Sequence, residues 1–498
     1  MLVTPDLPQF NPYGLTENEI REKIDQEVLQ LKERISVLNT FRNTLAPVSG
    51  LPTEVLSEIF LHLLKDTSIF EIGWNPVDPV TVTRVCRRWR HTALTIPQLW
   101  ATIADKRSDV PIRIDQIEAY IQRSRTTPLS VHLWNPSASA LGACLAHIPR
   151  LRKLKLVGDS IDQQVVDEAL AQPAPLLAAL ELEAIILPPS DLFSGVHPNL
   201  RSLLLDKCLL PFSSGVGQSL VSSAKITRLH LIYHSPLIAA EHFSKILISL
   251  QNLKELRLVA SLDHRAIPHP QTLPRIALHN LEIIKIEEDS CEVSFKFLEW
   301  LDIPAACISI LPDDRPDWEA LCSGFSTYQQ QMPGSFDIRN ISIRGEPGQR
   351  TTLNISSDEF SHRYSFQLKD TNNPARRILQ HLDISQVTSI TLDSTPLFGL
   401  DSHLLQLDFV ETFTLLPMIT DPEDLEDIVA LLSPDDDHSE DDEDEDDEKL
   451  CLFPKLKELT IGPLEDELYD MLLEIVASRE KMGLGSIKLD VVRRGTES

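Results

Sequence analysis

The chain has 498 residues, with 46 Lys and Arg against 74 Asp and Glu, so its formal net charge is −28. This length is too great for one ordinary core, because a single domain usually holds roughly 100–200 residues. Apolar residues make up 42% of the chain, which is enough for packed cores and too many for a disordered protein. The strong negative charge excludes a general binder of nucleic-acid phosphates, since such binding depends on clustered Lys and Arg.

Segments and motifs that are missing from the sequence limit the cell compartments and the chemical activities that we expect for this chain. The N-terminal residues MLVTPDLPQF lack a basic region followed by an apolar stretch, and no run reaches the roughly 18 apolar residues that would cross a bilayer. Seven scattered cysteines without a C-x-x-C pair fit free thiols in a reducing compartment. We therefore expect a cytoplasmic or nuclear protein with no membrane span, no metal site, no cofactor and no catalytic residues.

Residues 1–46 contain a predicted helix over 16–45 that starts at a capping box formed by Thr16 and Glu19. Apolar residues recur in this helix at spacings of four and three, as in one side of a coiled coil: Ile24, Val28, Leu31, Ile35 and Leu38. One interpretation is a short coiled coil that dimerises the chain through residues 20–40. The other is an amphipathic helix that packs on its own protein, because sustained coiled coils usually run for three to four heptads.

Residues 47–104 predict a small all-helical domain. Its first helix follows Leu51-Pro52, where proline suits the first turn, and carries a broad apolar face from Val55 to Leu64. A second helix is expected around Val82 to Ala93, followed by Leu99-Trp100. Two helices and a tryptophan make a very small core, so this domain needs a partner or a neighbouring domain for stability.

Residues 108–498 repeat the pattern L-x-x-L-x-L, as at Leu151 to Leu156 and Leu253 to Leu258. Most successive units are 23 to 28 residues apart, which is the period of leucine-rich repeats. The predicted fold class is therefore an α/β solenoid: a small all-α domain followed by a leucine-rich-repeat horseshoe with a parallel sheet on its concave face. Each repeat buries little alone, and stacking creates the continuous core.

A long gap between two of the repeats contains an acidic insert at residues 433–452. Residues 435–448 include 12 acidic side chains, interrupted by His438 and Ser439. Self-repulsion predicts an extended, disordered segment. It is interpreted either as a solubilising loop or as a docking segment for basic proteins.

Residues 47–103 resemble the F-box, in the F-box-like form frequent in fungal proteins. The resemblance rests on PVSGLPTEVLSEIFLHLL and VTRVCRRWRHTALTIPQLWATI. Four landmarks stand there in the expected order: the opening Leu-Pro, the Ile-Phe of the first helix, the V-C-R-R-W-R of the second, and the terminal Leu-Trp. It implies a domain that docks on a Skp-type adaptor of a cullin–RING ubiquitin ligase, while the repeats hold an unknown protein substrate and perform no catalysis. Carried over to this chain, the resemblance places Leu51 and Pro52 at the adaptor contact. It assigns five further apolar residues to the domain core or to the adaptor face, two roles that the sequence alone does not separate: Leu56, Ile59, Val82, Val85 and Trp89.

The outward residues of the first repeats suggest a basic strip that could receive substrate. The candidates are Lys153, Lys155, Arg228, His230, Arg257 and Lys285. One hypothesis is that this strip binds an acidic or phosphorylated segment, since Lys and Arg clusters form charge-assisted hydrogen bonds with such groups. The other is a solvated strand face with charges of either sign. A different function also remains open: a repeat scaffold or chaperone for basic proteins that uses the acidic loop, independently of a ubiquitin ligase.

Overall fold

The structure is a computed structural model. It divides into two compact units, Met1–Trp134 and Asn135–Ser498. It describes residues 16–65, 79–105, 112–159, 161–187, 193, 196–209, 225–233, 237–238, 240–262, 275–288, 291–303, 307–310, 318–331, 338–345, 351–357, 363–368, 382, 384–393, 404, 407–416, 429, 432–433, 452–462, 464 and 466–491. Within these residues, no helix is both long enough and apolar enough to cross a membrane.

The first unit begins with helix α1 (Glu17–Thr44), which has the predicted capping box. The Thr16 backbone N–H donates to Glu19 Oε2 at 2.7 Å, and the Glu19 N–H donates to Thr16 Oγ1 at 3.4 Å. These bonds satisfy two of the backbone donors that a helix start leaves unpaired. The backbone N–H of Thr16, and after it the Thr16 hydroxyl, lower the pKa of the Glu19 carboxyl by donating to it.

Short elements complete the first unit: η1 (Pro47–Gly50), α2 (Thr53–Lys65), α3 (Pro79–Thr83), α4 (Arg87–Thr95), η2 (Pro97–Trp100), β1 (Thr102–Ala104), α5 (Ile114–Ser124) and β2 (Leu129–Trp134). The second helix expected from the sequence is two helices, because Cys86 adopts an extended conformation between α3 and α4. Cys86 caps α4, with its Sγ accepting from the Trp89 N–H at 3.4 Å. The expectation of one continuous helix through Val82 and Ala93 was therefore wrong.

The tryptophan that ends the helical segment joins it to the rest of the first unit. Trp100 is fully buried, and its indole N–H donates to the Ala93 carbonyl at 2.9 Å. Its ring meets the Tyr120 ring edge-on at 5.2 Å, and the Arg123 guanidinium lies 4.4 Å from its centroid. Through these contacts α5 becomes part of the same compact unit, which ends at Trp134.

The second unit is built on a sheet whose strand order is β3-β4-β5-β6-β7-β9-β11-β14-β13-β12-β15-β16-β17-β18. The bounds are β3 (Leu151–Val157), β4 (Ala179–Glu183), β5 (Ser202–Asp206), β6 (Arg228–Ile232), β7 (Glu255–Val259), β9 (Ile283–Glu287), β11 (Cys307–Ile310), β12 (Asn340–Arg344), β13 (Thr351–Ser356), β14 (Arg363–Leu368), β15 (Ser389–Asp393), β16 (Thr412–Leu416), β17 (Glu458–Ile461) and β18 (Lys488–Val491). A separate pair consists of β8 (Ile276–Ala277) and β10 (Leu301–Asp302).

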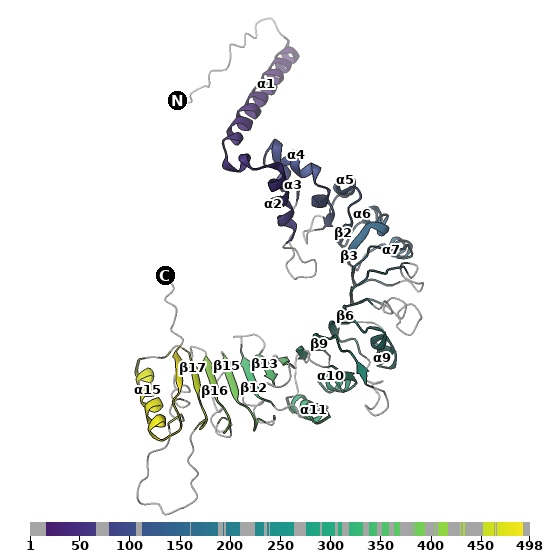
Figure 1. Cartoon of the computed structure of the whole chain (residues 1–498). Helices are drawn as coiled ribbons and strands as arrows, with labels where there is room; N and C mark the ends of the chain where they lie inside the picture. The colour runs from purple at the N-terminus through teal and green to yellow at the C-terminus, as the bar shows by residue number, and fades with distance from the viewer. Residues whose placement is uncertain are drawn as a thin grey trace, which may run out of the picture. The chain divides into compact units, whose positions relative to one another are not determined.

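Helices follow several of these strands and lie along one face of the sheet (Figure 1). They are α6 (Ala138–Leu145), α7 (Gln163–Leu170), α9 (Ala240–Ser249), α10 (Cys291–Leu298), α11 (Trp318–Gln331) and α15 (Asp466–Lys481), with a short η3 (Ile148–Arg150). The middle apolar residues of the repeats pair directly across parallel strands, from Leu154 with Leu180 onward to Ile284 with Ile308. The predicted solenoid with a parallel sheet is therefore confirmed.

The sheet departs from simple repetition at β12, β13 and β14. β13 is antiparallel to both of its neighbours, and β14 lies beside β11, so these three strands occupy the sheet in reverse order. Only six residues join β12 to β13, and six join β13 to β14. Parallel neighbours need a crossover of about a dozen residues or more, whereas such short links allow hairpins. The sequence pattern missed this reversal because it showed no separate unit at β13.

Successive repeats turn through a left-handed residue two positions after the last leucine of the L-x-x-L-x-L pattern, as Ala184 follows Leu182. These residues are Asn135, Gly158, Ala184, Lys207, Tyr233 and Ala260. Each donates its backbone N–H to a carbonyl of the next strand, as from Ala184 to Asp206 at 2.8 Å and from Ala260 to Glu287 at 2.7 Å. The turn thus extends the ladder by one bond and fixes the register of the following repeat.

A buried arginine holds both flanks of the acidic insert. Arg479 on α15 is fully buried, and its guanidinium donates to the carbonyls of Leu432 at 2.9 Å, Leu452 at 3.0 Å and Phe453 at 2.6 Å. Residues 434–451, which include the whole acidic run, lie outside the described residues. One side chain thus binds described residues on both sides of this segment.

Replacement of Gly158 by alanine is expected to destabilise the second unit by about 3 kcal/mol. Gly158 has φ +151°, and an added Cβ would overlap Asn135 Oδ1 and come within 3.2 Å of the Asn135 Cα. Chemical unfolding of the full chain measures the loss. The control is Gly142→Ala in α6, where a Cβ meets no atom within 4 Å and a gain of about 0.5–1 kcal/mol is expected. Equal effects of the two variants would contradict the account of the turn.

Candidate functional site

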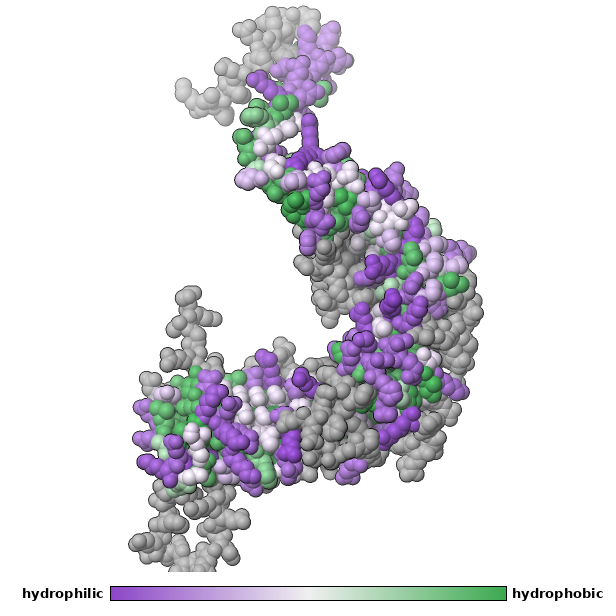
Figure 2. Space-filling view, in the orientation of Figure 1, coloured by the Kyte–Doolittle hydropathy of each residue, from purple (hydrophilic) through white to green (hydrophobic). Residues whose placement is uncertain are grey.

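The helical domain presents apolar side chains on its surface. Ile59 is 40% exposed and Val85 is 55% exposed, and Val48 of η1 and Val55 of α2 are exposed to a similar degree. Figure 2 shows hydrophobic atoms at the surface of the region that holds η1, α2 and α4. These four residues are called the docking face below. Exposed apolar side chains gathered on a small domain are typical of a protein–protein contact.

A second set of apolar residues fills the core of the same domain. Leu56 is 0% exposed and Val82 is also buried. Trp89 is half-buried, and its ring lies 5.1 Å from that of buried Phe60. Leu56 and Phe60 therefore form one stripe of α2, while Val55 and Ile59 form the next stripe around the helix.

The structure thus separates the seven residues that the sequence proposed for adaptor binding. Two of them, Leu56 and Val82, belong to the core, and Trp89 and Leu51 are half-buried. The other three are exposed: Pro52, Ile59 and Val85. The sequence proposal did not include Val48 and Val55. For Val55, the available signal was its spacing of four residues from Ile59, which places both on one side of a helix.

An arginine positions the loop in front of α2. The Arg88 guanidinium donates through both terminal nitrogens, to the carbonyl of Ser49 and to that of Leu51. Ser49 Oγ in turn donates to the Asn43 carbonyl at 2.5 Å, which ties the loop to the end of α1. These bonds hold Leu51-Pro52 at the start of α2. Sequence reasoning missed Arg88 because it is one of four arginines in the run R-V-C-R-R-W-R, and nothing in the run distinguishes it.

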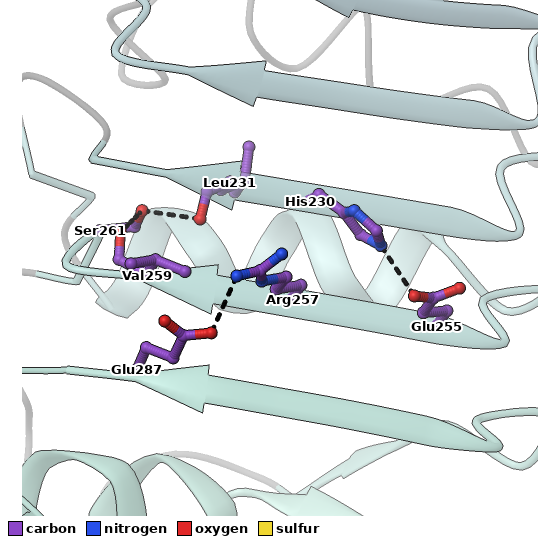
Figure 3. Close-up of polar contacts among 7 residues, drawn as sticks. All are labelled: His230, Leu231, Glu255, Arg257, Val259, Ser261 and Glu287. Atoms are coloured by element: carbon purple, nitrogen blue, oxygen red, sulfur yellow. Dashed lines mark hydrogen bonds and ion pairs between the residues drawn. The ribbon is translucent and has the colours of Figure 1, made fainter. Parts of the chain in front are cut away.

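The second candidate site lies on the face of the sheet away from the helices, called the open face below. Register places the outward residues of β3 to β9 in three rows that run across the strands. The middle row consists of Lys155, Glu181, Leu204, His230, Arg257 and Lys285. Figure 3 shows His230 and Arg257 projecting from neighbouring strands on the side opposite the helix.

Carboxylates neutralise most of the basic residues in the middle row. Lys155 forms an ion pair with Glu181. His230 Nε2 lies 3.0 Å from Glu255 Oε1, and this hydrogen bond is the largest cause of the lowered pKa of Glu255. Arg257 Nη2 lies 2.9 Å from Glu287 Oε1 (Figure 3). Burial is the largest influence on Glu181 and raises the pKa of its carboxyl, although Lys155 acts in the opposite direction.

The two outer rows carry opposite charges. The row at the strand starts contains Lys153, Arg228 and one carboxylate, Glu255, so it is basic on balance, and the pKa of Lys153 is lowered by burial and by the nearby arginines. The row at the strand ends contains Glu183, Asp206 and Glu287. Burial, followed by the charge of Glu183, raises the pKa of Asp206, and Asp206 Oδ1 is buried without a hydrogen-bond partner.

The open face of β3 to β9 is therefore balanced in charge, which favours the alternative of a strand face with charges of either sign over a basic strip. Among its outward residues, Lys153, Lys155, Arg228, Arg257 and Lys285 stand against Glu181, Glu183, Asp206, Glu255 and Glu287. The candidate residues expected from the sequence lie in the middle row and in the row at the strand starts. The third row, at the strand ends, is the acidic one.

From β11 to β17, the middle row of the open face changes to uncharged hydroxyl and amide side chains, and it ends at Asp490 in β18. In spatial order it continues through Ser309, Ser365, Asn354, Ser342, Thr391, Thr414 and Thr460. The reversed order of β12 to β14 brings Asn354 into this row. In the described part of the sheet, the middle row is thus charged from β3 to β9 and neutral and polar from β11 to β17. Within the described residues, no group of three or more His, Cys, Asp or Glu side chains could hold a metal ion.

Comparison with known protein families supports the helical domain. Residues 48–106 match the family model described as F-box-like. A solved structure of a leucine-rich-repeat protein from Leptospira interrogans is similar over 76% of this chain and 92% of its own, with 12% sequence identity and a TM-score of 0.27. No curated protein matches the chain. With the strand register described above, the chain carries an F-box-like domain followed by a solenoid of the leucine-rich-repeat type, and the resemblance to the fungal form stays a prediction.

Replacement of Asp206 by asparagine is expected to stabilise the second unit by about 1 kcal/mol at pH 7. The pKa of Asp206 is raised in the folded chain above its ordinary value of 3.8, so ionisation disfavours folding as the pH rises through the raised pKa. The gain should disappear below about pH 3.8, where the wild-type carboxyl is protonated in both states. Unfolding of both proteins across this pH range measures the difference.

The control for this experiment is Asp162→Asn at the N-cap of α7. The Asp162 carboxylate accepts from the Val165 N–H, and asparagine caps a helix equally well, so little change is expected. A loss of stability in Asp206→Asn at pH 7 would show that Asp206 is satisfied in the fold and would contradict the prediction.

Proposed function

We propose that the chain is the substrate-recognition subunit of a Skp–cullin–F-box-type E3 ubiquitin ligase and is itself non-catalytic. The F-box-like domain docks on a Skp-type adaptor and thereby on a cullin–RING ligase. The repeats bind the protein to be ubiquitylated. The observation that carries the proposal is the docking face, formed by Val48, Val55, Ile59 and Val85 on a domain that matches the F-box-like family.

Packing and burial support this role for the docking face. Leu56 and Val82 already fill the core, so the exposed residues are not needed to hold the two helices together. Transfer of several aliphatic side chains from water into a contact with a partner is favourable by roughly 25 cal/mol per Å² of apolar area. Arg88 supports the contact by fixing the Leu51-Pro52 segment at its edge.

The open face of β3 to β9 is the proposed substrate surface. Its candidate contacts remain Lys153, Lys155, Arg228, His230, Arg257 and Lys285. Because carboxylates on neighbouring strands pair with several of these residues, a purely acidic segment would have to compete with Glu181, Glu255 and Glu287. A substrate with charges of both signs suits this surface better, since specificity comes from complementary charge patterns. In this proposal, the six candidate residues hold the charged groups of such a substrate in a matching pattern.

The rival function as a scaffold or chaperone for basic proteins depends on the acidic segment 433–452. Its acidic residues lie outside the described part of the chain, so no structural observation favours this role. The docking face distinguishes the two functions, because a chaperone would not need it.

The double variant Ile59→Asp/Val85→Asp is expected to bind a purified Skp-type adaptor at least about 30-fold more weakly than the wild type. Truncation or charging of a central interface residue typically costs about 2 kcal/mol or more. Both side chains are exposed, so the circular dichroism spectrum and the unfolding midpoint should remain close to those of the wild type. Isothermal titration calorimetry with the full chain measures the affinity.

The matched control is Ile248→Asp, which alters an isoleucine that is 51% exposed on α9 of the second unit. Its adaptor affinity should equal that of the wild type. Equal affinity of the double variant and the control would sink the proposed docking face. Failure of the wild-type chain to bind the adaptor would sink the proposed function itself.

A further inference from the structure

Helix α1 is a 28-residue helix in which no residue is buried. The stripe formed by Ile24, Val28, Leu31, Ile35 and Leu38 is 39% to 60% exposed along its whole length. Most helices in proteins owe their stability to the packing of an apolar face, not to helix propensity alone. The apolar stripe of α1 is therefore expected to pack against another surface.

The contact that α1 makes with the helical domain leaves the stripe uncovered. Arg87 on α4 donates to Ser36 Oγ at 2.8 Å, and the end of α1 is joined to η1 through the bond from Ser49 to the Asn43 carbonyl. Ser36 follows Ile35 and lies to one side of the stripe. The helix is thus attached at its C-terminal half while the stripe faces outward.

We propose that the stripe of α1 pairs with the same stripe of a second copy of this chain, as a short parallel two-stranded coiled coil. In heptad terms, Val28 and Ile35 occupy the a positions, and Ile24, Leu31 and Leu38 occupy the d positions. β-Branched residues at a with leucine at d favour two parallel strands. A two-fold pair buries the same stripe from both copies, so no other surface has to match it.

Charges beside the stripe match a second copy in this orientation. Glu27 lies at a g position, and Lys32 lies five residues later at the e position of the next heptad. In a parallel pair, g of one helix faces this e position of the other, so Glu27 and Lys32 would form two symmetric ion pairs. In the antiparallel register that overlaps the stripes best, Glu27 would face Arg34 and Lys32 would face Asp25, which are also opposite charges. The β-branched residues at the a positions, not the charges, therefore favour the parallel pair. The stripe covers little more than two heptads, so the expected association is modest and depends on concentration.

The test compares two leucines of the same helix in the full chain. Leu31 lies in the stripe at 49% exposure, and Leu29 lies outside it at 58% exposure. Sedimentation equilibrium should show a concentration-dependent dimer for the wild type and for Leu29→Glu. Leu31→Glu should raise the dimer dissociation constant at least about tenfold, because it places two like charges in the seam.

Charge reversal tests the parallel orientation. Glu27→Lys and Lys32→Glu should each weaken the dimer, and the double variant should restore it, because the pair is merely exchanged. In the antiparallel arrangement the double variant sets the new lysine side chain against Arg34 and fails to recover.

Three outcomes would overturn the proposal. They are a wild type that stays monomeric at all concentrations, a dimer that Leu31→Glu leaves unchanged, and a double charge variant that does not recover. Association of the stripe with the adaptor or with the chain's own repeats would appear as a monomeric wild type. Adaptor affinity, measured on the same variants, should be unaffected by Leu31→Glu, so the dimer and the proposed ligase function can fail independently.

Discussion

From β3 to β9, one repeated backbone hydrogen bond holds the register of the sheet, from a left-handed turn residue to the strand that follows. Where Ala184 donates to Asp206 and Ala260 donates to Glu287, the bond fixes which residues of adjacent repeats stand opposite one another. Side chains alternate between the two faces of a strand, so a slip of one residue would turn every apolar residue outward. The fixed register therefore keeps the leucines in the interior and sets the three rows of the open face.

The same constraint explains the charge of the open face. Lys155 meets Glu181 because the two residues stand directly opposite one another, while Arg257 stands opposite Lys285 and meets Glu287 diagonally, two residues further along β9. Spacing along the sequence shows which residues face outward, but the charge of the surface depends on all three rows together. A surface with both signs of charge in fixed positions can select a partner by pattern, while a purely basic strip would attract many acidic molecules.

Much of the fold was predictable from the sequence, because its strongest signals are local or periodic. The L-x-x-L-x-L spacing located the strands and the parallel sheet, and Thr16 with Glu19 located the start of α1. The reversed order of β12 to β14 was not predicted, because the chain folds back there through two short links and leaves the repeat pattern. The role of Arg479 was also hidden, since its three carbonyl partners are distant in the chain and backbone oxygens carry no sequence signal. Similarly, only packing distinguishes buried Leu56 from exposed Ile59, two apolar residues three positions apart on one helix.

Hydrogen–deuterium exchange of the full chain, with and without a Skp-type adaptor, tests the central claim most directly. If the F-box-like domain docks through Val48, Val55, Ile59 and Val85, adaptor binding should slow amide exchange in η1, α2 and α4, where these residues lie or adjoin. Exchange in β3 to β9 should stay unchanged, because that sheet face is proposed for the substrate. Slower exchange in β3 to β9 with no change in the helices would contradict the account, as would the absence of any change at saturating adaptor.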